Sequence, residues 1–307
     1  MKKITRFIFL ANMVLFSVGC SKDYLNTLPT DRVSADEIFS SLENATTAVN
    51  GIYRFMFERT TLVGSNTQNK PGVGGIMLAM DFMGEDLGIG ASTWYTSTGE
   101  GNWVGHRNES HDLMEYDYRT FYKIIGDANF ILDNVSKVNA SEEERNVLRS
   151  QALTLRAYAY SFLVQLYGKR YDSSASPNNQ LGVPLVLKSS EVALPRATVE
   201  EVYAAIVKDL DDAIALKVSD RKNKSQANMD VAIGLRARVA LTMQDYENAI
   251  LYAKKLIGMS NYKLMTPSEY LKGFNDANAL SEFIWASMPT PDQDAVFVSY
   301  FSQIAYN

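Results

Sequence analysis

Signals for the start of a helix recur along this chain, and apolar residues spaced three and four apart follow each of them. Ser34, Ser141 and Thr198 each precede a glutamate by three residues. In such a capping box the hydroxyl and the carboxylate satisfy free backbone N–H groups of the first helical turn. The stretch SEFIWASM is an exception and is predicted to be a short buried strand with Trp285 in the core. The chain is therefore predicted to be mostly α-helical, with few short strands.

One predicted helix, residues 151–168, should lie at the centre of the domain. Its sequence, QALTLRAYAYSFLVQLYG, is apolar on almost every side, and Gly168 is predicted to end it. The apolar faces of neighbouring predicted helices are formed, in chain order, by Ile38, Leu42, Ala45, Val49, Ile52 and Met56; by Tyr118, Phe121, Ile125, Ala128, Leu132 and Val135; and by Val199, Val202, Tyr203, Ile206, Val207, Leu210 and Ile214.

Two further amphipathic segments, 229–241 and 246–257, are separated only by the short break Gln244-Asp245. Two antiparallel helices joined by a tight turn match a tetratricopeptide-like unit of about 34 residues. We therefore expect the helices between about residues 118 and 260 to form a scaffold of such units. Scaffolds of stacked helix pairs usually bind other molecules.

The segment 60–110 is rich in Gly, Ser, Thr and Asn and shows no periodicity. Long irregular segments inside compact domains are often functional. This loop-rich insert contains Trp94, Tyr95, Asn102 and Trp103. Aromatic rings can pack under the C–H face of a sugar while polar side chains bond its hydroxyl groups, so these four residues are predicted to bind a ligand. The alternative is that the aromatic rings only pack the insert onto the helices.

The N-terminus has the composition of a signal peptide. Positive residues open the chain, and residues 7–18, FIFLANMVLFSV, are nearly all apolar. This run is shorter than the roughly 20 residues of a membrane-spanning helix. Cys20, the only cysteine, follows it and is predicted to carry a lipid that anchors the protein. The alternatives are a conventional cleavage near Cys20 and an anchor that is never cleaved.

The predicted organisation is a signal peptide over residues 1–19, a tether over 20–33 and one domain over 34–307. The formal net charge of -5 gives no bulk attraction to nucleic acid. A single cysteine allows neither an internal disulfide nor a cysteine-based zinc site. The chain contains no P-loop and no GxSxG motif, and no cofactor is predicted.

Two groups of polar residues are of the types that occur in glycosidase active sites and in metal sites. Asp81, Glu85 and Asp86 form an acidic cluster, and paired carboxylates can hydrolyse glycosidic bonds, so a glycan hydrolase is one alternative. His106 and His111 are the only histidines. They lack the i, i+4 spacing of the HExxH motif, so no metal site is predicted.

Several long stretches of the chain form a recognisable series. In chain order they are CSKDYLNTLPTD with TTAVNGIYR, YKIIGDANFILDNV, RSQALTLRAYAYSFLVQLYG, LGVPLVLKSS with LPRATVEEVYAAIVKDLDDAI, and KSQANMDVAIGLRARVALTMQDYENAILYAKKLI with SEFIWASM. In content, order and spacing these stretches resemble the SusD/RagB family of outer-membrane nutrient-binding lipoproteins of Bacteroidetes. The resemblance covers nearly the whole chain.

The resemblance implies a function without catalysis. Members bind glycans, or peptides in RagB-type members, and deliver them to a SusC-type TonB-dependent β-barrel transporter at the cell surface. The implied fold is a tetratricopeptide-like helical scaffold with a loop-rich ligand surface, in which Trp94 is the nearest counterpart of a ligand-binding tryptophan. Family members typically continue past residue 307, so the C-terminal remainder of the domain is expected to be absent here. A tetratricopeptide-like scaffold of an envelope complex is the alternative function.

Overall fold

The computed structural model divides the chain into two units, residues 1–38 and 39–307. It describes residues 34–64, 70–84, 103–189, 193–259, 261–274 and 276–288. The predicted signal peptide, Cys20 and the tether lie outside these ranges. The described part of the first unit is Ser34 with helix α2, Ala35–Ile38, and the hydroxyl of Ser34 accepts a hydrogen bond from the backbone N–H of Glu37 at 3.2 Å.

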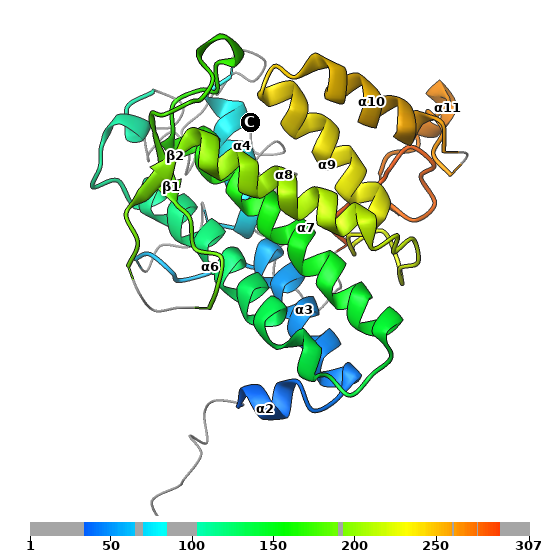
Figure 1. The fold of residues 1–307 in the computed structure, drawn as a ribbon. Helices are drawn as coiled ribbons and strands as arrows, with labels where there is room; N and C mark the ends of the chain where they lie inside the picture. The colour runs from blue at the N-terminus through cyan, green and yellow to red at the C-terminus, as the bar shows by residue number, and fades with distance from the viewer. Residues whose placement is uncertain are drawn as a thin grey trace, which may run out of the picture. The chain divides into compact units, whose positions relative to one another are not determined.

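The second unit is built mainly of helices (Figure 1), which confirms the predicted fold class. The longer helices are α3 (Leu42–Phe57), α4 (Gly72–Phe82), α6 (Asp112–Asn134), α7 (Glu142–Tyr167), α8 (Val199–Ala215), α9 (Met229–Thr242) and α10 (Tyr246–Ile257). The short elements are η2 (Gly105–Arg107), η3 (Val135–Lys137), η4 (Ser173–Ala175), α11 (Pro267–Tyr270) and the strands β1 (Leu181–Pro184) and β2 (Arg196–Thr198), which pair antiparallel.

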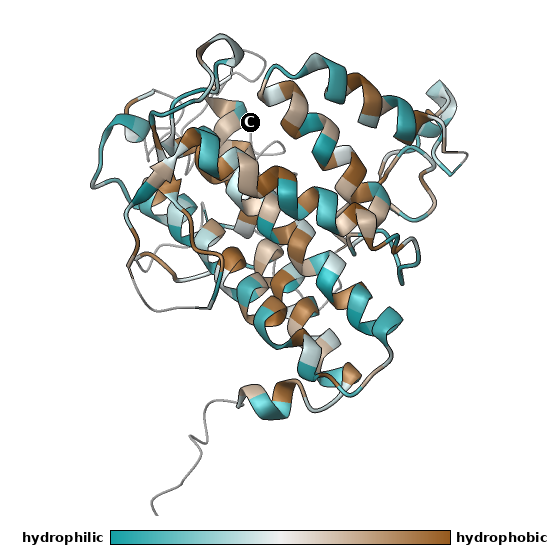
Figure 2. Cartoon of the chain, in the orientation of Figure 1, coloured by the Kyte–Doolittle hydropathy of each residue, from teal (hydrophilic) through white to brown (hydrophobic). Residues whose placement is uncertain are grey.

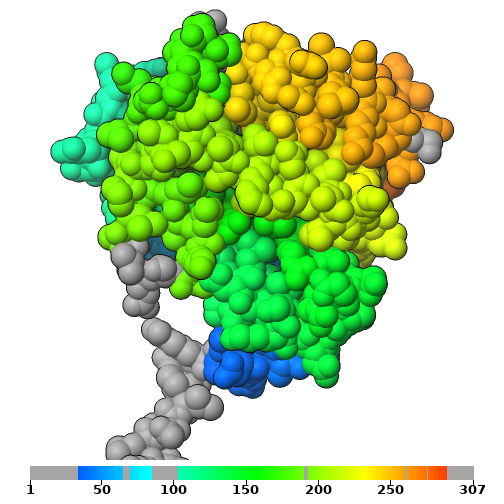
Figure 3. Space-filling view, viewed as in Figure 1, coloured from blue at the N-terminus to red at the C-terminus, as the bar shows by residue number. Residues whose placement is uncertain are grey.

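Helix α7 is the centre of the second unit, as its sequence predicts. Every residue from Ser150 to Val164 is buried, and α8 and α9 cover its middle on the face seen in Figure 3. Figure 2 shows apolar residues along most of its length. The capping box of Ser141 and Glu144 begins the helix, and Gly168 ends it, both as predicted. The equivalent box of Thr198 and Glu201 begins α8.

Three sequence predictions about helix boundaries are wrong. The face from Ile38 to Met56 does not belong to one helix, because a second N-cap, Ser41, starts α3 after a break at residues 39–41. Helix α6 begins at Asp112, six residues before the first predicted position, Tyr118. The segment 60–110, predicted to be irregular, contains α4, whose sequence GVGGIMLAMDF is apolar on most sides and so shows no amphipathic period.

Trp285 lies against the core but not on a strand. Residues 281–288 form turns and extended chain, which contradicts the predicted strand. The indole N–H of Trp285 donates to the carbonyl of Ser225 at 2.8 Å, and its ring meets the edge of Tyr158 at 5.3 Å between centroids. A local pattern cannot show these partners, because they lie 60 and 127 residues away.

Helices α9 and α10 form the antiparallel pair that the sequence predicts. Apolar and polar residues alternate along α10 (Figure 2), and several of the apolar ones are exposed. Ala249 and Leu256 are half-buried, whereas Tyr246, Ile250 and Ile257 are 61, 54 and 80% exposed. The apolar residues of this amphipathic helix are therefore only partly covered.

A buried polar network ties the segment after β1 to the helices. Arg156 of α7 donates two hydrogen bonds to the carboxylate of Asp209 of α8, both at 2.7 Å. The same guanidinium donates to the side-chain oxygen of Asn129 at 2.7 Å and to the carbonyl of Leu187 at 3.0 Å. The amide of Asn129 donates to the carbonyl of Val186 at 2.9 Å. We call Asn129, Arg156 and Asp209 the polar core.

Within the part of the chain that the structure describes, none of the helices combines the length and the apolar character needed to cross a membrane.

Candidate functional site

Trp103 is the one predicted ligand-binding residue within the described ranges. Its side chain is 54% exposed, just before the short helix η2. Its backbone has a φ of 56°, a left-handed conformation that is uncommon for a bulky residue. The ring of His106 meets the indole edge-on at 5.2 Å between centroids. His106 thus packs against part of the indole, and about half of Trp103 remains exposed.

The other predicted residues of the insert, Trp94, Tyr95 and Asn102, lie outside the described residues. So do Glu85 and Asp86 of the acidic cluster, while Asp81 is exposed in the last turn of α4. The structure therefore does not test whether these side chains lie together.

The two histidines have local structural roles. His111 caps α6, because its Nδ1 accepts a hydrogen bond from the backbone N–H of Leu113 at 3.3 Å. His106 packs on Trp103. Among the described residues there is no group of three or more His, Cys, Asp or Glu side chains that could hold a metal ion.

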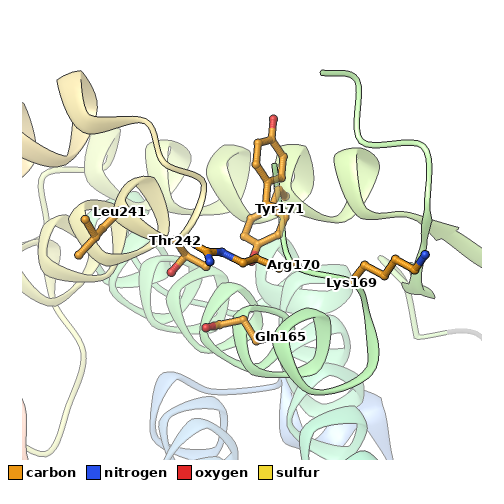
Figure 4. A pocket seen from close by; sticks show the side chains of 7 residues that line it. Gln165, Lys169, Arg170, Tyr171, Leu241 and Thr242 are labelled. Atoms are coloured by element: carbon orange, nitrogen blue, oxygen red, sulfur yellow. The ribbon is translucent and has the colours of Figure 1, made fainter. Parts of the chain in front are cut away.

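A pocket of about 290 Å³ lies where α7 and α9 end beside α8 (Figure 4). We call it the tyrosine pocket; its lining is Gln165, Lys169, Arg170, Tyr171, Tyr203, Leu241 and Thr242. Arg170 and Thr242 lie close to each other in this view, whereas Lys169 points away from them. The lining thus joins the turn after α7 to residues that lie more than 30 positions away in the chain.

Two tyrosines form the most buried part of this lining. The rings of Tyr171 and Tyr203 meet edge to face at 5.2 Å. The hydroxyl of Tyr171 donates to the carboxylate of Glu200 at 3.1 Å, and the same carboxylate accepts from the backbone N–H of Asn178 at 2.9 Å. This backbone hydrogen bond is the main reason why the pKa of Glu200 is lowered. Burial raises the pKa of Tyr203 to about 12 and also raises the pKa of Tyr171. Both hydroxyl groups therefore stay neutral at physiological pH.

The tyrosine pocket offers binding groups rather than an acid–base pair. Arg170 and Lys169 can donate hydrogen bonds as cations, while Gln165 and Thr242 can donate and accept. Neither a carboxylate nor a histidine belongs to its lining. Sequence reasoning missed this pocket because its residues come from three separate helix ends, and no local pattern marks them.

The tyrosine pocket and Trp103 lie at the same end of the helix pair α6–α7. The hydroxyl of Tyr167, in the last turn of α7, donates to the carbonyl of Met114, in the first turn of α6, at 2.5 Å. Trp103 precedes α6 by nine residues, and Lys169 follows α7 by two. Trp103 itself does not line the pocket.

Comparison with known proteins identifies the family. Residues 85–241, just over half of the chain, match a SusD-like family described as "Starch-binding associating with outer membrane". The chain belongs to the SusD-like family. The matched range includes about half of the insert, the polar core and nearly all of α9.

Individual SusD-like relatives agree with this assignment. SusD-like protein P25 of Formosa agariphila is 27% identical over 173 residues, which cover 55% of this chain and 31% of that protein. The crystal structure of a SusD-like carbohydrate binding protein from Bacteroides vulgatus is 27% identical, with a TM-score of 0.72 over 85% of this chain and 53% of that one. The chain therefore spans about a third to a half of the length of these relatives.

A third similarity concerns the fold alone. Surface glycan-binding protein A from Bacteroides thetaiotaomicron, solved in complex with laminarihexaose, is 17% identical. It gives a TM-score of 0.55 over 73% of this chain and 44% of that protein. The helical scaffold of this chain is thus shared with proteins of low sequence identity.

Proposed function

We propose that this SusD-like protein captures a glycan at the outer membrane and delivers it to a SusC-type TonB-dependent transporter. The match of residues 85–241 to a starch-binding family carries this proposal. The carbohydrate-binding relative from B. vulgatus and the laminarihexaose complex of the B. thetaiotaomicron protein support a glycan as the ligand. Trp103 supplies an exposed aromatic face of the kind that packs against sugar rings.

Capture is proposed without catalysis. The lining of the tyrosine pocket contains no carboxylate pair of the kind that glycosidases use. A lipid on Cys20 would hold the domain beside the transporter at a high effective concentration, so that a weak contact between the two proteins would suffice. Trp94, Tyr95 and Asn102 are proposed to extend the ligand surface from Trp103.

Trp103→Ala tests the proposed site. We expect the variant to bind starch or laminarin about tenfold more weakly than the wild type, a loss of about 1.4 kcal/mol of binding free energy, because the exposed ring face is removed. Calorimetry measures this affinity directly. Tyr246→Ala is the matched control, because Tyr246 is a similarly exposed aromatic residue on α10, and it should bind as the wild type does.

Two results would contradict the proposal. If the wild type bound neither polysaccharide nor any other glycan in a panel, glycan capture would be wrong. If Trp103→Ala and Tyr246→Ala both bound as tightly as the wild type, the ligand site would lie elsewhere. Circular dichroism of each variant confirms that the helices are intact.

A further inference from the structure

A second cavity, of about 300 Å³, lies between the loop that joins α8 to α9 and the chain after α10. Figure 1 shows these two segments side by side at the right of the view. We call it the asparagine cavity; its lining is Ser219, Arg221, Asn223, Lys224, Asn228, Asp230, Asn261, Tyr262 and Asn278. Polar and charged residue types make up its lining apart from Tyr262, and it shares no residue with the tyrosine pocket.

Hydrogen bonds hold the two walls of the asparagine cavity together. The backbone N–H of Lys224 donates to the side-chain oxygen of Asn278 at 3.1 Å, and its carbonyl accepts from the backbone N–H of Ala286 at 3.0 Å. The indole N–H of Trp285 donates to Ser225, the next residue. The cavity is therefore framed by contacts between segments about 60 residues apart.

Buried polar side chains that are held by hydrogen bonds line the inner side of the cavity. Asn228 and Asp230, at the start of α9, are only 3 and 4% exposed. The side-chain oxygen of Asn228 caps α9 by accepting from the backbone N–H of Val231 at 3.2 Å. The carboxylate of Asp230 accepts a hydrogen bond from the hydroxyl of Tyr262 at 2.8 Å. Burial raises the pKa of Tyr262 to about 12, so this hydroxyl stays protonated.

Two cations, Arg221 and Lys224, line the cavity together with the single carboxylate of Asp230. Arg221 donates to the carbonyl of Gln226 at 3.1 Å and to the hydroxyl of Tyr262 at 3.2 Å. The ammonium of Lys224 donates to the carbonyl of Leu280. Among the described residues, neither forms an ion pair with an acidic side chain. Burial, together with the positive charge of Arg221, lowers the pKa of Lys224, although the negative charge of Asp276 opposes this effect.

We propose that the asparagine cavity binds an acidic sugar unit, one that carries a carboxylate or a sulfate group. Arg221 and Lys224 would neutralise the anionic group, because the lining carries two cations against the single carboxylate of Asp230, which already accepts a hydrogen bond from the hydroxyl of Tyr262. The amides of Asn223, Asn261 and Asn278 can donate and accept, as sugar hydroxyl groups require.

The volume of the cavity suits a single sugar unit rather than a longer oligosaccharide. Its volume of about 300 Å³ is at the lower end of the range of small-molecule sites. The inference rests on the proposed glycan binding and narrows its ligand class, since a glycan with acidic units would contact the asparagine cavity as well as an aromatic surface.

Calorimetry of the full chain in detergent with three tetrasaccharides tests this inference. The probes are tetragalacturonate, which carries carboxylates, a sulfated carrageenan tetrasaccharide, and neutral maltotetraose. We expect at least one acidic probe to bind more tightly than maltotetraose, and its affinity to fall as salt is raised, because salt screens partly exposed charges. The acidic probe that binds more tightly identifies the anionic group.

Lys224→Gln and Arg221→Gln should each weaken binding of the acidic probe about tenfold. Lys222→Gln is the matched control: Lys222 lies on the same loop and is exposed, but it does not line the cavity, so its loss should change the affinity less than twofold. The fluorescence of Trp285, which is bonded to Ser225 beside Lys224, reports whether the frame of the cavity is intact in each variant.

The inference is wrong if the acidic probes bind no more tightly than maltotetraose, or if all three variants bind them equally. Glycan capture would survive either result as long as a neutral glycan bound in a Trp103-dependent manner. Loss of binding to every glycan would overturn both proposals together.

Discussion

Replacing Arg156 with methionine is expected to lower the free energy of unfolding by about 3–5 kcal/mol, because it leaves the buried carboxylate of Asp209 without its partner. The two side chains are only 10 and 6% exposed, and the guanidinium contacts the carboxylate through two parallel hydrogen bonds. The variant would also remove the donor to Asn129 and to the carbonyl of Leu187. Methionine fills part of the volume, so the loss reports mainly on the polar contacts.

The loss of unfolding free energy in Arg156→Met should depend on pH. Burial raises the pKa of Asp209 in the folded protein, although the guanidinium of Arg156 opposes this effect. Without Arg156 the pKa of Asp209 rises further, because the main interaction that opposes burial is lost. A carboxyl group whose pKa is higher in the folded than in the unfolded protein stabilises the fold at pH values below the unfolded pKa. This stabilisation is lost as the pH rises through the folded pKa. Arg156→Met should therefore be less destabilising in mild acid than at neutral pH.

Urea denaturation of three variants at two pH values tests this prediction. Adding Asp209→Leu to Arg156→Met should recover part of the lost stability, because it removes the unpaired buried charge. Lys208→Met is the surface control, since Lys208 pairs with Asp212 on the exposed side of α8, and it should leave the denaturation midpoint nearly unchanged. If Arg156→Met behaved like Lys208→Met, the polar core would not support the fold.

The sequence predicts the parts of this fold that depend on local patterns. Helix α7 was predictable because its cap, its apolar residues and its terminal glycine all lie within one segment. Helix α4 was not, because a helix that is apolar on most sides and rich in glycine lacks the period that marks a half-exposed helix. The break before α3 was missed because the apolar spacing continues across it.

Local sequence patterns do not predict sites whose residues come from distant segments of the chain. Trp103 is a sequence prediction because it is an aromatic residue in a segment without helical periodicity, and its role in binding stays a prediction. The pairing of Arg156 with Asp209 spans 53 residues, and the two walls of the asparagine cavity meet across about the same distance. Their residue types are ordinary ones for helix surfaces and loops. The packing of α7 against α8 brings Arg156 and Asp209 together, and the chain after α10 closes the asparagine cavity.

Two glycines at the start of α4 should respond in opposite ways to the same substitution. Gly72 has a φ of +63°, and a Cβ there would lie 2.2 Å from the carbonyl oxygen of Met56 in the last turn of α3. Gly72→Ala should therefore cost about 1–3 kcal/mol for the left-handed backbone alone, and displacement of the main chain adds to this cost. Gly74 lies two residues later in the helix, where a Cβ would meet nothing within 4 Å.

Gly74→Ala should instead stabilise the protein by roughly 0.5–1 kcal/mol, because alanine loses less conformational freedom than glycine when a helix forms. Urea denaturation of both variants measures the two effects against a common wild type. A similar shift in both would mean that α3 and α4 do not cross as closely as the distance at Gly72 requires. Shifts in opposite directions would establish that contact. Helix α4 leads directly into the segment that carries Trp94 and Tyr95. Gly72→Ala should therefore also weaken glycan binding, whereas Gly74→Ala should leave it unchanged.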